Sequence, residues 1–157
     1  MAKWKDFLKK WNMDSLKFKT NFLEMDLSFK DADRDAAWEL YIELVTRITT
    51  QNLNENDGDE KTALSSIYSI FPLTREVIKK YKRDCLQFSK IAIIVLNQVI
   101  RPFTAKWHKI SIEEGFNKDN SIEFRKELKG LQGKLLDYTK LLGDLAGVES
   151  CDDLTEL

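Results

Sequence analysis

The most apolar run of the chain, IAIIVL at residues 91–96, lies inside a helical pattern that extends from Thr74 to Ile100. Apolar side chains recur three or four positions apart along this stretch, at Val77, Tyr81, Cys85, Phe88, Ile91 or Ala92, Val95 and Val99. Across residues 91–96 the predicted helix is apolar on nearly every side, and such a helix is normally buried on every side. We therefore expect a long helix over residues 75–100 at the centre of a helical bundle.

The C-terminal part of the chain has the most regular pattern. From Phe124 to Leu145, apolar residues alternate four and three positions apart, which is typical of a seam between packed helices. Ser121 is expected to cap this helix and Gly147 to end it. Only 2 prolines and 6 glycines occur in 157 residues, which favours long helices over many short strands. The sequence thus predicts an all-α fold, a bundle of about five helices around the long central helix.

Residues 1–30 are expected to form an N-terminal amphipathic helix followed by an extended arm. The first twelve residues place four large apolar side chains on one helical face, surrounded by lysines; these are Trp4, Phe7, Leu8 and Trp11. They are candidate partner-binding residues. The same helix can instead fold back onto its own domain or, as a weaker alternative, lie on an anionic membrane surface. Residues 31–147 are expected to form the helical bundle, and residues 148–157 a frayed acidic tail.

Proline and glycine positions suggest where helices end or approach each other. Pro72 is expected to end a helix that precedes it, with Thr74 as the cap of the next. Pro102 either kinks a continuous helix or starts a new one. Gly130 and Gly133 each cost about 1 kcal/mol relative to alanine in a helix interior. They predict a close approach by another backbone or side chain.

Composition excludes several classes of function. A net charge of −1 argues against a general nucleic-acid binder, which usually carries a basic excess. With a single histidine and no paired cysteines, neither a metal site nor a cofactor is expected. The apolar run at residues 91–96 is too short to span a bilayer. We expect a soluble, cytoplasmic protein.

The segment that follows the central helix contains the one pattern with catalytic character. Arg101 and His108 are separated by six residues, R-PFTAKW-H, which resembles the R-x(4–6)-H motif of HEPN ribonucleases. That resemblance implies a small all-helical protein, usually a dimer, in which Arg and His of two protomers meet in a cleft. The guanidinium would polarise a phosphate and the imidazole would activate the ribose 2′-hydroxyl. Arg101 and His108 are therefore the candidate catalytic residues.

Longer segments look similar to those of uncharacterised small bacterial proteins that are loosely associated with phage-defence loci; among them are AAWELYIELVTRI, SIYSIFPLTREV and VLNQVIRPFTAKWH. The resemblance implies a bacterial accessory or regulatory subunit. Our leading expectation is a non-enzymatic protein-interaction subunit that binds a protein partner or itself. A metal-independent HEPN-like ribonuclease is the alternative, and only then is RNA a partner.

Overall fold

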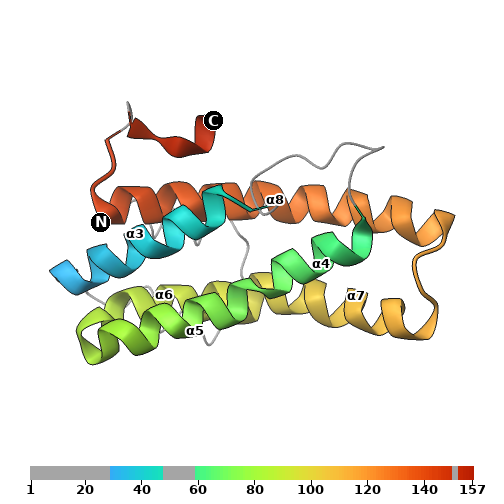
Figure 1. The fold of residues 1–157 in the computed structure, drawn as a ribbon, viewed down its shortest axis with the longest axis horizontal. Helices are drawn as coiled ribbons and strands as arrows, with labels where there is room; N and C mark the ends of the chain where they lie inside the picture. The colour runs from blue at the N-terminus through green and yellow to red at the C-terminus, as the bar shows by residue number, and fades with distance from the viewer. Residues whose placement is uncertain (1–28, 48–58, 150–151) are drawn as a thin grey trace.

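The computed structural model describes residues 29–47, 59–149 and 152–157, which are predominantly helical and contain no strand (Figure 1). The predicted all-α fold is confirmed. The helices are α3 (Asp31–Val45), α4 (Glu60–Tyr68), α5 (Ile70–Tyr81), α6 (Leu86–Val95), α7 (Arg101–Glu113) and α8 (Lys118–Ala146). Three shorter turns are the 3₁₀ segments η1 (Lys82–Cys85) and η4 (Leu154–Glu156) and the π-helical turn η2 (Leu96–Ile100).

Several of these helices follow one another end to end, so the expectation of about five helices was wrong. Ser69 joins α4 to α5 in helical conformation, with its amide donating to Ser65. The π-helical turn joins α6 to α7 in the same way. Figure 1 shows the α4–α5 rod and the α6–α7 rod running back along each other, with α3 and α8 beside them.

The predicted central helix over residues 75–100 is broken by a turn. Lys82 has φ 56° and ψ −135°, outside the helical region, and α5 ends at Tyr81. The following 3₁₀ turn buries Cys85, whose thiol lies 3.4 Å from the carbonyl oxygen of Lys82. The break reverses the chain, so α6 packs on α3 instead of continuing away from it. Burial of both halves outweighs the strain of one non-glycine residue at positive φ.

The expectation that Pro72 ends a helix was also wrong. Pro72 lies in the first turn of α5, where the missing N–H costs no helical hydrogen bond. Thr74 is not a cap but a buried residue within α5.

Helix α3 occupies the middle of the packing, in contact with α5, α6 and α8. Its inner face is buried and includes two small residues, Ala36 and Ala37. The close approach that was predicted at Gly130 and Gly133 is not found there, since no described residue lies within 4 Å of a Cβ built on either glycine. It occurs elsewhere on α8. A Cβ built on Gly143 would meet the Tyr41 ring at 3.1 Å, so the small residue required for α3–α8 packing is Gly143.

The π-helical turn accounts for how Pro102 is accommodated. Arg101 donates its amide to Leu96, five residues back, and α7 begins with Pro102 in its first turn. An ideal α-helix rotates about 100° per residue, so buried Val95 and Trp107 would lie on different faces of one uninterrupted α-helix. A π-turn takes in one extra residue and brings the two buried faces back into line. Pro102 therefore lies at the start of a new helical segment, which is the second of the two predicted alternatives.

The C-terminal residues pack on the bundle rather than fraying. The Tyr41 hydroxyl donates to Asp153 at 3.1 Å and accepts from the amide of Leu154 at 2.7 Å. Leu154 packs against the core. In Figure 1 this segment lies back over α3 and α8.

Candidate functional site

Arg101 and His108 both lie on the side of α7 that faces the α4–α5 rod. The guanidinium of Arg101 lies 4.9 Å from the centroid of the Phe71 ring, and its Nε donates to Asn97 at 3.2 Å. The half-buried His108 ring packs edge-on against Tyr68, with ring centroids 5.1 Å apart. Arg101 therefore rests on the buried ring of Phe71, and His108 rests on the exposed ring of Tyr68.

The two candidate catalytic residues do not contact each other. Seven helical positions separate them, which places them on the same face but about 10 Å apart along the axis. In the described ranges no hydrogen bond joins Arg101 to His108. One chain therefore presents a guanidinium and an imidazole on the same face of α7, but it does not bring them together around one reacting atom.

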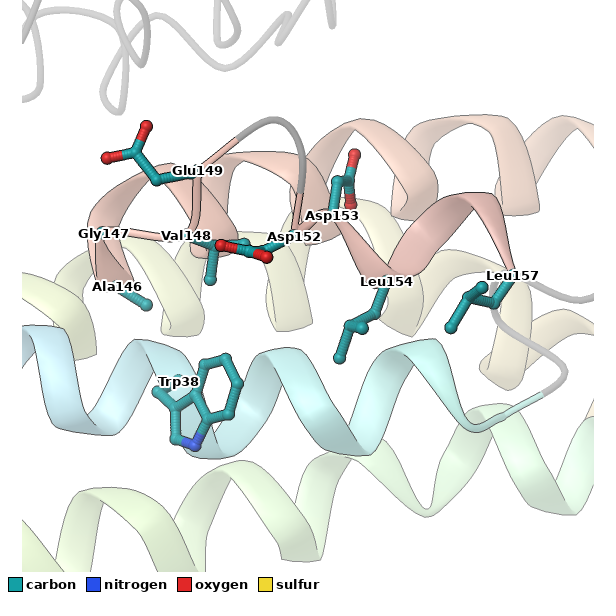
Figure 2. Close-up of a pocket in the computed structure, with 9 residues that line it drawn as sticks. All are labelled: Trp38, Ala146, Gly147, Val148, Glu149, Asp152, Asp153, Leu154 and Leu157. Atoms are coloured by element: carbon teal, nitrogen blue, oxygen red, sulfur yellow. The ribbon is translucent and has the colours of Figure 1, made fainter.

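A second candidate site, which sequence patterns did not identify, is centred on Trp38. Figure 2 shows its indole on the outer side of α3, facing Leu154 and Val148 of the C-terminal segment. The groove has a volume of about 580 Å³, within the range of ligand-binding clefts. We call it the Trp38 groove; its lining residues are Trp38, Ala146, Gly147, Val148, Glu149, Asp152, Asp153, Leu154 and Leu157.

Helix α3 forms one wall of this groove, and the hydroxyl of Tyr41 holds the other wall in place. Trp38 remains 45% exposed although it stacks on the buried Tyr41 ring, with centroids 5.8 Å apart. Burial raises the pKa of Tyr41, so the hydroxyl stays protonated and able to donate to Asp153. Burial alone would raise the pKa of Asp153, but hydrogen bonds from Thr155 and Tyr41 lower it below its ordinary value. Asp153 is thus a carboxylate that anchors the C-terminal wall of the groove.

The rim of the groove is acidic. In Figure 2 the carboxylates of Glu149, Asp152 and Asp153 lie along the side formed by the C-terminal segment. Within the described residues, neither Glu149 nor Asp152 makes a salt bridge, whereas Glu156 lies 3.7 Å from Lys140. The groove therefore combines an apolar floor with two exposed carboxylates, those of Glu149 and Asp152, that have no cationic partner in the part of the chain described.

A smaller groove of about 390 Å³ lies on the other side of Trp38, between α3 and α5. Glu39, which lines it together with Glu43 and Glu76, is already engaged, because it accepts from Lys80 and from the Tyr81 hydroxyl, the latter at 2.5 Å. Burial would raise the pKa of Glu39, but these two hydrogen bonds lower it. This groove extends the apolar surface around Trp38 without adding an unsatisfied carboxylate at Glu39.

Sequence reasoning missed the Trp38 groove because its two walls are far apart along the chain. The tail, which forms one of these walls, was expected to fray. The available signal was an apolar residue, Leu154, within an acidic segment. The four predicted partner-binding residues Trp4, Phe7, Leu8 and Trp11, and the extended arm, lie outside the described residues and remain predictions.

Two other kinds of site were sought in the described ranges. Those residues include no group of three His, Cys, Asp or Glu side chains placed to hold a metal ion. None of the helices described is both long and apolar enough to cross a membrane. Comparison with known proteins found no matching family model, no matching curated protein and no matching solved structure.

Proposed function

We propose that this chain is a non-enzymatic protein-interaction subunit whose binding surface is the Trp38 groove. The observation that carries the proposal is Trp38 itself, a large aromatic side chain that is 45% exposed on a helix whose other face is fully packed. Tryptophan is enriched among the residues that dominate protein–protein binding energy. Leu154 and Leu157 extend the apolar floor around it.

The acidic rim restricts the chemistry of the partner. Glu149 and Asp152 are exposed and have no salt bridge among the described residues. Opposite charge across an interface speeds encounter and selects against wrong partners. The surface is therefore suited to an amphipathic helix that carries apolar residues on one face and lysine or arginine beside them.

This function is that of an accessory or regulatory subunit in the bacterial cytoplasm. A place in a phage-defence system is part of the same proposal, which rests there on sequence resemblance alone. The partner is a different protein or a second copy of this chain.

The test is affinity capture from the source cells, followed by reconstitution with the purified partner. We expect Trp38→Ala to weaken that complex by about 30-fold or more, the usual effect of losing a central tryptophan. Ile122→Ala is the matched control, because Ile122 is 64% exposed on α8 and does not line the groove. A complex that is insensitive to Trp38→Ala rejects the proposal.

A second candidate function is the HEPN-like, metal-independent ribonuclease. It is supported by the common face of α7 that carries Arg101 and His108, with Arg101 exposed to solvent. In a dimer, that face would allow the arginine of one protomer to lie near the histidine of the other.

His108→Phe separates catalysis from folding. The phenyl ring preserves the packing against Tyr68 but can neither donate nor accept a proton. With single-stranded RNA and EDTA, we expect a loss of about 100-fold or more in cleavage rate and little change in melting temperature. Lys109→Ala is the neighbouring control. A wild-type protein that leaves the RNA intact eliminates this candidate.

A further inference from the structure

The Trp38 groove is an apolar surface with an acidic rim, and this chain contains a segment with the opposite chemistry. Residues 1–12 combine Trp4, Phe7, Leu8 and Trp11 with four lysines and a single acidic residue. We propose that residues 1–12 dock in the Trp38 groove of the same chain and occupy it until a partner displaces them. This inference rests on the proposed function, since it takes the groove to be a surface for basic amphipathic helices.

The match is one of both shape and charge. Positions 4, 7, 8 and 11 follow helical spacing, so the sequence predicts one apolar stripe about 10 Å long. Lys9 and Lys10 flank that stripe near its C-terminal end. A segment seated by its tryptophans against Trp38 and Leu154 brings lysines to the rim, where Glu149 and Asp152 make no salt bridge within the described ranges.

The covalent connection favours docking within one chain over docking on a second copy. Trp38 lies about 10 Å along α3 from its first residue, Asp31. Residues 13–28 can extend to about 50 Å, so their length does not prevent residues 1–12 from reaching the groove. A short tether gives an effective concentration on the order of millimolar, far above the micromolar concentrations of typical solutions. An affinity too weak for dimerisation would therefore still fill the groove.

Such docking would make partner binding competitive. An incoming helix would have to displace residues 1–12, so its apparent affinity would fall in proportion to the fraction of open chains. Charge reversal at Lys9 and Lys10 would open the groove and tighten partner binding, whereas Trp38→Ala would weaken it. The two effects have opposite signs.

Photo-cross-linking of the full-length protein tests the contact directly. Benzoylphenylalanine is introduced in place of Trp11, the protein is irradiated, and cross-linked peptides are mapped by mass spectrometry. We expect cross-links to Trp38, Val148, Leu154 or Leu157. Lys9→Glu with Lys10→Glu should lower their yield at least about fivefold, and adding Glu149→Lys with Asp152→Lys should restore it to within about twofold.

Mixing isotope-labelled with unlabelled protein identifies the chain that supplies the groove. Same-chain docking gives cross-linked peptides of uniform label, whereas mixed labels would show a second copy and overturn the inference. Cross-links confined to other surfaces, or a yield that is indifferent to both charge reversals, would also overturn it. The proposed function fails on a different result, a partner complex that is unaffected by Trp38→Ala, so the two failures are distinguishable.

Discussion

Asp33 connects the first turns of two helices through one buried carboxylate. One of its oxygens accepts the amide of Lys30 at 2.8 Å at the start of α3, and the other accepts the amide of Phe88 at 2.9 Å in the first turn of α6. The residue is only 1% exposed. A buried carboxylate needs such partners, and the positive ends of two helix dipoles add to the stabilisation.

Replacing Asp33 with alanine should be strongly destabilising. Asp33→Ala leaves the buried amide of Phe88 without its acceptor and also removes the acceptor of the Lys30 amide, and we expect the free energy of unfolding to fall by about 2–4 kcal/mol. Urea denaturation followed by circular dichroism measures it. Asp35→Ala, at an exposed position of the same helix, is the control and should cost less than about 1 kcal/mol. Equal losses for the two variants would show that the link to α6 contributes nothing.

Protonation of Glu127 should lower the free energy of unfolding, because its carboxylate joins α8 to α7. It accepts from the indole of the buried Trp107 at 2.9 Å and from the ammonium of Lys106. Burial would raise the pKa of Glu127, but these two hydrogen bonds lower it below the ordinary 4.5. The stabilisation is therefore fully present above pH 4.5 and is lost as the pH falls through the lower pKa of the folded state.

Glu127→Gln should reveal this dependence. The amide oxygen can still accept from Trp107, but the charge that attracts Lys106 is gone. We expect a loss of about 0.5–1 kcal/mol at pH 7, modest because the carboxylate is partly exposed. The difference should shrink as the pH falls below 4.5, and denaturation curves from pH 3 to 7 measure it. Glu123→Gln, which removes only a contact to Lys106, is the control. A constant difference at every pH would contradict the assignment.

At the scale of elements, α8 shows how the same residue type can have opposite roles along one helix. Among the residues described, nothing lies within 4 Å of the position where a Cβ on Gly133 would stand. Gly143 faces the Tyr41 ring, which is buried and held by its hydroxyl contacts and therefore has little freedom to move. Only the second glycine is needed for packing.

The two glycine-to-alanine substitutions should thus differ in sign. Gly133→Ala should raise the free energy of unfolding by about 0.5–1 kcal/mol, because alanine is the better helix former and has open space there. Gly143→Ala should lower it, since an added methyl pushes α3 away from α8. Thermal unfolding of the matched pair measures both. Stabilisation by both substitutions would mean that the α3–α8 contact can relax.

Local patterns were sufficient for the seam and the C-terminal end of α8 but not for its start, where Asn117 caps the helix by accepting from the amide of Asn120 and the predicted cap, Ser121, lies inside it. They were also insufficient for the helix that was expected over residues 75–100. Gly147 ends α8 with φ 82°, and the amide of Val148 returns to the carbonyl of Gly143, as its sequence predicted. At Lys82, by contrast, the helical spacing of apolar residues continues straight through the break. The turn is set by the packing of α5 and α6 on α3, which no local pattern contains. The Trp38 groove was unpredictable for the same reason.

At the scale of the whole molecule, the hydroxyl of Tyr41 links the C-terminal residues to helix α3. It contacts both Asp153 and Leu154, more than one hundred positions away. These two hydrogen bonds, together with the packing of Leu154 on the core, hold the second wall of the Trp38 groove. Local opening of the C-terminal segment should therefore cost far less than global unfolding.

Tyr41→Phe isolates that role, because the ring still packs on Gly143 and Trp38. We expect a loss of about 1 kcal/mol or less in global stability. Amide hydrogen exchange at Leu154 should accelerate by up to about tenfold. Hydrogen-exchange mass spectrometry measures the second effect, and Tyr68→Phe, at an exposed tyrosine, is the control. Unchanged exchange at Leu154 would show that apolar packing alone holds the segment.

The π-helical turn at Leu96–Ile100 makes the length of this segment as important as its composition. Because the turn holds one residue more than an α-helical turn needs, deleting one residue there would let it relax to α-helix with Val95 and Trp107 still about 20° apart on one face. Arg101 and His108 both lie beyond the turn and would keep the face that they share. Inserting one residue, by contrast, would rotate everything beyond it by about 100° and turn Trp107 out of the core. Single-residue deletions in this segment should therefore be tolerated far better than single-residue insertions.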